Sequence, residues 1–409
     1  MRRNPDEKKS RPKLKDFKLN ALLEVTKAIN HNFPTSELLT IYEQIVREKL
    51  NIGKLVLFSN QETGWACLLQ YGVGDQFLNI DVDKEFSGIS EIRTMDFTSR
   101  NLQKSFEIVV PVFHKQRPLA YVLIGDLNED QLELSPTIKH LPFIQTLTNI
   151  IIVAIENKKL AKENIRQAAM KKELELAWEM QRLLFPTMLP HTERYEVGAL
   201  YLPHLQVGGD YYDFIELNEN EFVFCVADVS GKGVPAALLM SNFQANLRVL
   251  LGIIPSLTEL VHELNTKVMS SAKGEKFITL FIAKYNTITR TLTYVNAGHN
   301  PPLLVSGGSV NLLKIGCTGL GMFDELKKVK EGIVNISHPS TILSYTDGLV
   351  ELENEKDEEF GMKRLQELVL QNQKLATKEL NTLIIDTVED YKGDMPYVDD
   401  IALFCCKIF

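Results

Sequence analysis

Cysteine is scarce in this sequence, and the cysteines that are present form no recognisable motif. The chain of 409 residues has five cysteines, an odd number, and no CxxC pair. They are Cys67, Cys225, Cys317, Cys405 and Cys406. Several lie within apolar runs, which is typical of buried, reduced thiols. The pattern therefore favours neither a disulfide framework nor a thiolate zinc site.

Long apolar runs and a basic excess are also missing. No uninterrupted apolar stretch approaches the length of a membrane span. The N-terminus lacks the apolar core of a signal peptide. The net charge is −8, whereas a surface that binds nucleic acid needs a basic excess. We therefore expect a cytoplasmic protein with no membrane span and no nucleic-acid partner.

Motifs for covalent catalysis and for nucleotide binding are absent as well. The sequence has no GxxxxGKS/T phosphate loop and no GxSxG nucleophile elbow. It also has no cysteine that is followed five residues later by an arginine loop. These absences disfavour a nucleotide-binding kinase and a hydrolase that works through a serine or cysteine nucleophile.

The first part of the chain has the pattern of a small α+β domain, in a chain long enough for two or three domains. Residues 1–16 are basic and almost without apolar side chains, which predicts a disordered tail. Residues 17–155 then show a helix pair, a strand hairpin, a second strand pair and an apolar helix from 141. This order is typical of an α+β domain with a mostly antiparallel sheet.

Residues 156–190 are expected to connect two domains through one long helix. The segment 156–185 contains no proline or glycine and is rich in Lys, Glu, Ala and Leu. One stripe of this helix is apolar, with imperfect heptads: Ile165, Ala169, Leu176, Met180 and Leu183. A two-chain coiled coil, and hence a homodimer, is one interpretation. A single amphipathic helix that lies on one of the domains is the other.

Residues 191–409 alternate strand and helix patterns, with too many strands for a doubly wound sheet. Strands are expected at intervals from Tyr195 to Ile408. Helices are expected at 234–251, 256–271, 363–371 and 377–391. We predict two packed, mainly antiparallel sheets covered by helices, which makes the whole chain α+β in class.

Aspartates in this last segment recur where a predicted strand meets a turn. They are Asp210, Asp228, Asp347 and Asp399, the last of which is followed by Asp400. Taken singly, Asp210 and Asp228 are explained equally well as turn and cap residues. Strand ends of one fold can also bring such side chains together, and an all-carboxylate site favours Mg²⁺ or Mn²⁺ over zinc. Two such ions would activate a bridging water and neutralise a phosphoryl group without any covalent nucleophile.

Several motifs around these aspartates resemble one family of phosphatases. They are GGDYYD (208–213), ADVSGKGVPAAL (227–238), NAGHNPPL (296–303), TGLGMF (318–323), SYTDGLVE (344–351) and DDIAL (399–403). In this order they are similar to the SpoIIE/RsbU-type branch of the PP2C-like (PPM) serine/threonine phosphatases, over roughly residues 170–409. The resemblance implies a PP2C-like β-sandwich flanked by helices over 191–409.

The same resemblance implies a site for two divalent cations, Mn²⁺ or Mg²⁺. By position, the implied ligands and catalytic residues are the side chains of Asp210, Asp228, Asp347 and Asp399, with the backbone carbonyl of Val229 as a further ligand. Asp400 is the less favoured member of its pair. Because every acidic position of the motif is filled, an inactive relative of the family is disfavoured.

Two other polar residues in the motifs have open roles. His299 could act as an acid, although a structural turn histidine is the simpler interpretation. Lys232 could contact phosphate or could be a solvated loop lysine.

The first domain resembles a GAF domain, through its order of elements and through the segment VPVFHKQRPLAYVLIG (110–125). This resemblance implies either a sensor of a small ligand or a domain that only packs and dimerises. The phosphatase resemblance implies dephosphorylation of a phosphoserine or phosphothreonine protein, an anti-anti-sigma (STAS) protein of a bacterial partner-switching pathway, under control of the N-terminal domain. The alternative is an inactive scaffold that docks signalling partners through the same domain.

Overall fold

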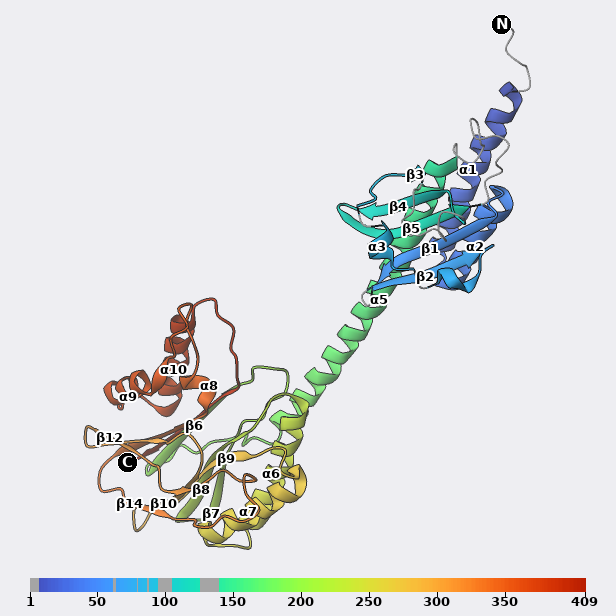
Figure 1. Ribbon diagram of the computed structural model, residues 1–409. Helices are drawn as coiled ribbons and strands as arrows, with labels where there is room; N and C mark the ends of the chain where they lie inside the picture. The colour runs from blue at the N-terminus through green and yellow to red at the C-terminus, as the bar shows by residue number, and fades with distance from the viewer. Residues whose placement is uncertain (1–6, 62–63, 79, 87, 95–104, 126–139) are drawn as a thin grey trace. The chain divides into compact units, whose positions relative to one another are not determined.

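The structure is a computed structural model that describes residues 7–61, 64–78, 80–86, 88–94, 105–125 and 140–409. The chain divides into two compact units, Met1–Gln167 and Ala168–Phe409 (Figure 1). Helix α5 (Leu141–Arg182) is one continuous helix with residues in both units. None of the helices in the described ranges combines the length and the apolar character that a membrane span requires.

The first unit is one antiparallel sheet with helices on both faces. The order of its strands is β2-β1-β5-β4-β3. Their bounds are β1 (Lys54–Gln61), β2 (Gly64–Tyr71), β3 (Arg93–Thr94), β4 (Ile108–His114) and β5 (Arg117–Gly125). The helical segments are α1 (Glu7–Asn30), α2 (Thr35–Glu43), the π-helical η1 (Gln44–Lys49), η2 (Asp75–Phe77) and α3 (Val82–Phe86). The predicted α+β order is therefore present, whereas the GAF-like character of the unit remains a prediction.

The basic N-terminal segment differs from expectation. Helix α1 begins at Glu7, so residues 7–16 are helical, although a disordered tail through 16 was predicted. Lysine, arginine and glutamate are good helix formers, and the segment continues an amphipathic helix that buries Val25. The structure thus differs from the predicted tail over residues 7–16, and residues 1–6 lie outside the described residues.

The second unit contains two sheets. One has the order β13-β10-β9-β8-β7, with β14 paired to β10, and the other has the order β12-β11-β15-β16-β6. The strands are β6 (Tyr195–Leu202), β7 (Tyr211–Asn218), β8 (Glu221–Val229), β9 (Ile278–Asn286), β10 (Thr291–Ala297), β11 (Leu303–Ser306), β12 (Ser309–Leu312), β13 (Gly316–Cys317), β14 (Gly332–Asn335), β15 (Ser340–Tyr345) and β16 (Ile401–Ile408). All pairs are antiparallel except β10 with β13.

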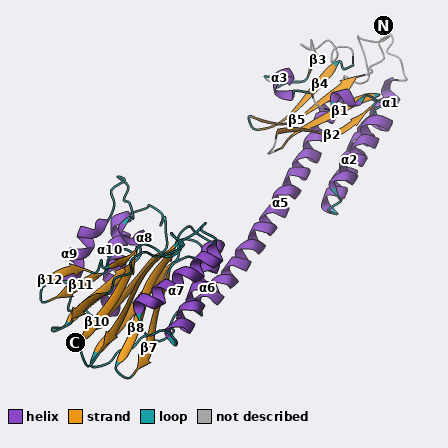
Figure 2. Ribbon diagram, turned by 60° about the horizontal axis from the view of Figure 1, so that its bottom comes forward, coloured by secondary structure: helices purple, strands orange, loops and turns teal. Residues whose placement is uncertain are grey.

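The two sheets stack face to face, and helices cover the outer faces (Figure 2). The helices are α6 (Val234–Leu251), α7 (Leu257–Ala272), the short α8 (Asp347–Val350), α9 (Gly361–Gln371) and α10 (Thr377–Lys392). One core lies between the sheets, a second under α6 and α7, and a third under α9 and α10. The predicted sandwich with flanking helices is confirmed.

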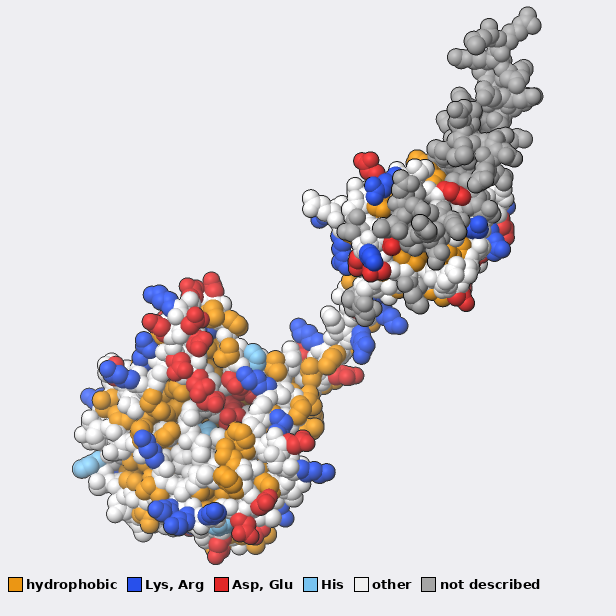
Figure 3. Space-filling model, viewed as in Figure 1, with side chains coloured by type: hydrophobic (Ala, Val, Ile, Leu, Met, Phe, Trp, Pro, Cys, Tyr) orange, Lys and Arg blue, Asp and Glu red, His pale blue; other side chains and the backbone are white. Residues whose placement is uncertain are grey.

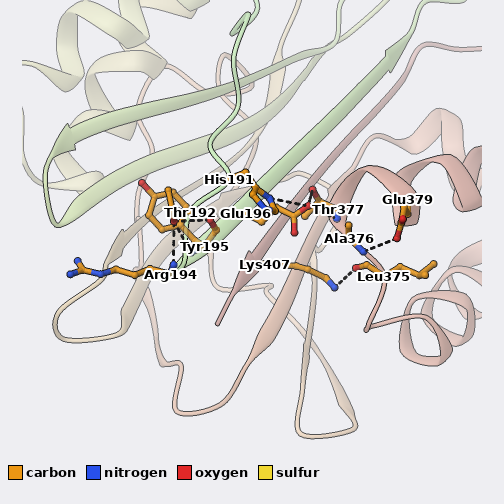
Figure 4. A network of polar contacts seen from close by, with 10 residues as sticks. All are labelled: His191, Thr192, Arg194, Tyr195, Glu196, Leu375, Ala376, Thr377, Glu379 and Lys407. Atoms are coloured by element: carbon orange, nitrogen blue, oxygen red, sulfur yellow. Dashed lines mark hydrogen bonds and ion pairs between the residues drawn. The ribbon is translucent and has the colours of Figure 1, made fainter.

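A network of polar contacts fixes α10 to its sheet (Figure 4). Glu196 of β6 and Lys407 of β16 face each other in register. The Glu196 carboxylate accepts hydrogen bonds from the backbone N and the hydroxyl of Thr377, at 2.9 and 2.8 Å. The Lys407 ammonium donates to the carbonyls of Gln373 and Leu375. This buried cross-strand pair provides hydrogen-bond partners for the backbone at and just before the start of α10, so its role is structural.

A buried ion pair fixes α6 to the other sheet. Arg248 donates from Nε and Nη2 to the two carboxylate oxygens of Asp213, each at 2.8 Å. Asp213 is completely buried in β7 and also accepts a hydrogen bond from the Tyr211 hydroxyl. Asp213 therefore depends on Arg248 for its charge compensation.

We expect Arg248→Met to lower the free energy of unfolding by about 3 kcal/mol, because it leaves the Asp213 carboxylate buried without a cation. The measurement is urea unfolding followed by Trp178 fluorescence in a Trp65→Phe background, since the chain has two tryptophans. Arg47→Met is the matched control, because Arg47 pairs with Glu43 at an exposed position and should cost below about 1 kcal/mol. Equal effects of the two substitutions would contradict the prediction, and adding Asp213→Asn to Arg248→Met should recover part of the loss.

Candidate active site

Strand alternation directs one of the predicted site residues, Asp228, toward the space between the sheets. In β8, Phe222, Phe224 and Val226 pack in the core between the sheets, whereas the alternate residues face α6 and α7. Asp228 has the same parity as the first set, so it points to the inter-sheet side at the end of the strand. It lies within β8 rather than just after it, because β8 stays paired with β9 as far as Val229.

Asp210 directly precedes β7 and lies next to Asp228. The Asp210 side chain is 2% exposed, and its Oδ2 has no hydrogen-bond partner among the described residues. Burial, then the charges of Asp228 and Asp400, raise the pKa of Asp210 well above its usual range, and the Thr346 hydroxyl partly opposes this shift. Burial and then the charge of Asp347 raise the pKa of Asp228 to about 7. These carboxylates are therefore close enough to repel one another strongly.

Asp347 reaches the same place from the other sheet. It follows β15, opens the short helix α8, and has Thr346 as its N-cap residue. Burial and the neighbouring charge of Asp399 raise the pKa of Asp347. Gly348 allows this approach, since a Cβ there would lie 2.2 Å from the carbonyl oxygen of Asp400. Acidic side chains gather over the region of α8 (Figure 3).

Asp399 and Asp400 have different surroundings. Asp400 is buried and accepts hydrogen bonds from the backbone N atoms of His204 and Gly209, both at 2.8 Å, and from Tyr201 at 3.3 Å. Asp399 is 39% exposed, and its carboxylate forms an ion pair of 2.8 Å with Lys232. The Asp400 carboxylate is thus hydrogen-bonded to backbone N–H groups. The Asp399 carboxylate instead lies beside Asp347 and pairs with the Lys232 ammonium.

Lys232 and Val229 belong to the loop that follows β8. The Lys232 ammonium pairs with Asp399 and donates to the Val398 carbonyl, so it is not a freely solvated lysine. The loop is also fixed to β9, since Ser230 receives a hydrogen bond of 2.9 Å from the Phe277 backbone N. A Cβ at Gly209 would lie 2.9 Å from the Val229 carbonyl oxygen, which places that oxygen against the glycine pair before Asp210.

His299 is buried and braces strands near the carboxylates. Its Nδ1 lies 2.8 Å from the hydroxyl of Thr279, the cross-strand partner of Asp228. Burial lowers the pKa of His299 to about 4, and an interaction with the Tyr345 backbone opposes the shift. The imidazole is therefore neutral at neutral pH, which favours the structural interpretation over an acid.

The donor set fits a hard divalent cation. Within the described ranges, no three His, Cys, Asp or Glu side chains converge closely enough to form a complete cation site by themselves. Mg²⁺, however, is usually bound through one or two carboxylates and keeps several waters. The orphaned Oδ2 of Asp210 beside the Asp228 carboxylate leaves buried negative charge that a cation would compensate. The role of Asp210, Asp228, Val229, Asp347 and Asp399 as metal ligands or catalytic residues remains a prediction.

The sequence did not indicate every residue that shapes this site. Asp400 positions the loop before Asp210, and Thr346 lies between Asp210 and the closing strand, where it accepts a hydrogen bond of 2.8 Å from Ala402 N. Gln181 of α5 contacts the same loop through the Gly208 backbone. The only signal for Asp400 in the sequence was its place in the DDIAL motif. Gln181 lies in a polar helical segment, and no motif around it indicated a role.

Repulsion among these carboxylates predicts how the metal-free protein responds to pH. Because the folded pKa of Asp228 is about 7 and its ordinary value is 3.8, the folded state binds more protons than the unfolded state between these values. Chelator-treated protein should therefore lose thermal stability as the pH rises from about 4 to about 7. Asp228→Asn should flatten this dependence and melt higher than the parent at pH 7.5 without metal. A lower melting temperature for that variant would contradict the prediction.

Comparisons with known proteins agree with this fold. The family model for stage II sporulation protein E (SpoIIE) matches residues 218–409. Phosphoserine phosphatase RsbU of Bacillus subtilis is 30% identical over 246 residues, which cover 59% of this chain and 71% of that protein. Phosphoserine phosphatase RsbP of the same organism is 24% identical over 186 residues, 44% of this chain and 46% of that protein. The solved SiaA-PP2C domain of Pseudomonas aeruginosa aligns with a TM-score of 0.54 at 22% identity, over 60% of this chain and 99% of that domain.

Two stacked, mainly antiparallel sheets with helix pairs outside are the PP2C-like fold. The similarity to two phosphoserine phosphatases shows that the chain is a protein serine/threonine phosphatase. The chain belongs to the SpoIIE family of these phosphatases.

Proposed function

We propose that the protein is a metal-dependent phosphatase that hydrolyses phosphoserine or phosphothreonine on a partner protein. The observation that carries this proposal is the cluster of Asp210, Asp228 and Asp347, in which burial raises the pKa of every carboxyl. A neighbouring charge raises each pKa further: that of Asp228 acts on Asp210, that of Asp347 on Asp228, and that of Asp399 on Asp347. A fold does not retain buried like charges for stability, and perturbed carboxylates in one cluster favour a functional site.

Each residue has a proposed part in the reaction. Two Mn²⁺ or Mg²⁺ ions, when bound, supply an activated water and neutralise the phosphoryl group. The carboxylates of Asp210 and Asp228 supply negative charge to the ions from one sheet. Asp347 and Asp399 supply negative charge from the opposite sheet. The Val229 carbonyl is the proposed neutral ligand. Asp400 orients the loop before Asp210, and His299 keeps Thr279 in place beside Asp228.

The proposed substrate is a small STAS-type phosphoprotein of a partner-switching pathway. RsbU and RsbP are both named phosphoserine phosphatases, which supports the substrate class. Exposed apolar side chains on α5, among them Ile165, Leu176 and Met180, support a homodimer formed through this helix. In that case the N-terminal unit regulates the phosphatase through α5. Activity and partner dependence that survive deletion of residues 1–155 unchanged would remove this regulatory role.

The direct test uses purified full-length protein and phosphorylated STAS proteins from its own genome. We expect Mn²⁺-dependent release of phosphate from at least one of them, and Mn²⁺-dependent hydrolysis of p-nitrophenyl phosphate that a chelator abolishes. The alternative, an inactive scaffold, would bind such proteins and show no metal-dependent turnover of either substrate. That result would overturn the proposed function.

A further inference from the structure

The loop that carries Lys232 joins β8 to α6 and is anchored at both ends. At its start, Ser230 N donates to the Phe277 carbonyl at 2.9 Å, and the Lys276 ammonium donates to the Ser230 carbonyl at 2.8 Å. Helix α6 begins directly after residue 233. The bridge between these anchors is therefore short, and it consists of residues 231–233.

Two glycines determine how this bridge presents Lys232. Gly231 has φ +83° and Gly233 has φ +71°, in the left-handed region that other residues rarely adopt. The chain therefore turns sharply on both sides of Lys232. The Lys232 side chain is 44% exposed, so its head group can change partners while its backbone stays in place.

The Lys232 ammonium lies at the edge of the carboxylate cluster. It forms an ion pair of 2.8 Å with Asp399 and donates to the Val398 carbonyl. Asp399 in turn lies against the start of α8, because a Cβ on Gly348 would be 3.2 Å from the Asp399 Cβ. Since Gly348 directly follows Asp347, the ammonium is placed beside the proposed cation site.

The ion pair between Lys232 and Asp399 is of a kind that is easily exchanged. Both side chains are more than a third exposed, and such pairs contribute little to stability. A divalent cation prefers carboxylate oxygens and carries twice the charge of an ammonium. When Asp399 binds a cation, Lys232 therefore loses this partner and keeps the Val398 carbonyl. An ammonium has three donors, so others are then available for an anion.

A phosphoryl group is the anion that best suits a lysine in this position. A phosphorylated serine or threonine carries almost two negative charges at neutral pH and three strong acceptor oxygens. Lysine binds phosphate as a compact point charge. Within the described ranges, no other ion pair joins a basic side chain to Asp210, Asp228, Asp347 or Asp399. Lys232 is therefore the strongest candidate for a cationic contact to the substrate.

We propose that Lys232 binds the phosphoryl group of the substrate, and that Asp399 pairs with Lys232 as long as Asp399 holds no cation. In the cation-free protein, the ammonium compensates the charge of Asp399. In the loaded site, the same ammonium compensates the charge of the phosphoryl group. This inference rests on the proposed metal-dependent function and adds a residue that contacts the substrate.

The test compares Lys232→Met and Lys232→Arg in the full-length protein. Methionine removes the charge and keeps most of the apolar stem, whereas arginine keeps the charge. Lys267→Met is the matched control, because Lys267 is an exposed lysine of α7. Three quantities are measured: the inhibition constant of inorganic phosphate against p-nitrophenyl phosphate at saturating Mn²⁺, the half-saturating Mn²⁺ concentration, and the rise in melting temperature that Mn²⁺ causes.

Lys232→Met should raise the inhibition constant of phosphate by about tenfold, the effect of losing one hydrogen bond from a charged donor. The same substitution should lower the half-saturating Mn²⁺ concentration by a factor of about three, because the ammonium no longer competes for Asp399. The Mn²⁺-induced rise in melting temperature should increase for the same reason. Lys232→Arg should stay within about threefold of the parent in both constants, and Lys267→Met should match the parent in all three quantities.

The outcomes separate the two parts of the proposal. A parental inhibition constant in Lys232→Met would overturn the contact with phosphate. Unchanged or weaker Mn²⁺ binding in that variant would overturn the exchange with Asp399, since a lysine that only fixes the loop has no cation to compete with. Absence of Mn²⁺-dependent hydrolysis in the parent would instead overturn the proposed function. The Mn²⁺-induced change in melting temperature would still test the exchange in that case, because it needs no turnover.

Discussion

Asp228→Asn should reduce the rate of phosphate release by on the order of a thousandfold, because the proposed metal site would lose a charged oxygen ligand at its centre. Asparagine matches aspartate in shape but brings no negative charge, and hard divalent cations prefer carboxylates. The substitution also removes the charge that raises the pKa of Asp210 next to it. The measurement is kcat for p-nitrophenyl phosphate across a series of Mn²⁺ concentrations, together with the Mn²⁺-induced change in melting temperature.

Asp386→Asn is the matched control for this result, since Asp386 is an exposed residue of α10. It should leave both quantities at the parental values. Activity within tenfold of the parent in Asp228→Asn, at every Mn²⁺ concentration, would show that Asp228 is not at the centre of the reaction.

Gly208→Ala should reduce activity by about a hundredfold and lower the melting temperature. A methyl group there would lie 1.9 Å from the Tyr201 hydroxyl and 2.1 Å from Asp400 Oδ2, so the backbone has to move. Movement of this loop displaces Asp210 and breaks the hydrogen bond of 2.8 Å between Gly209 N and Asp400. An overpacked buried site typically costs about 1–3 kcal/mol in stability. Phosphatase assays and thermal unfolding with and without Mn²⁺ measure the two effects.

Gly252→Ala provides the control for this second prediction. Gly252 follows α6 with φ −74°, and a Cβ there would meet only the Val249 carbonyl oxygen at 3.5 Å, an ordinary contact. Gly252→Ala should therefore leave both activity and melting temperature close to the parental values. Equal behaviour of the two alanine variants would mean that the Gly208 environment is less tight than the structure has it.

The large elements of the second unit were predictable because their patterns are local. The helix predicted at 234–251 is present with those bounds, and the helix predicted at 377–391 ends one residue later, at Lys392. The order of the motifs also predicted the fold, the family and the enzyme class. Short elements such as α8 were not predicted. Asp347–Val350 is a helix of only four residues, and Gly348 within it packs against the Asp400 backbone, a contact that no local pattern indicates.

Contacts between distant segments could not be predicted from these patterns. Asp399 and Asp400 are identical neighbours in the sequence, yet one pairs with Lys232 and the other binds backbone N–H groups. Only the parity of strand β16 separates them, because Asp400 lies on the same side as Ala402 and Phe404, which pack between the sheets. Gln181 is a similar case, since its hydrogen-bond partner, Gly208, lies 27 residues later in the chain.

Strand β6 lies at the edge of its sheet and pairs with β16, whose residues come about 200 positions later in the chain. While the chain is being synthesised, residues 195–202 emerge long before their partner, and their backbone groups stay unpaired in the meantime. An unpaired strand edge is a template for wrong association. Production of this protein should therefore benefit from slow translation or added chaperones, and aggregates formed at high expression rates should be enriched in chains that stop short of residue 401.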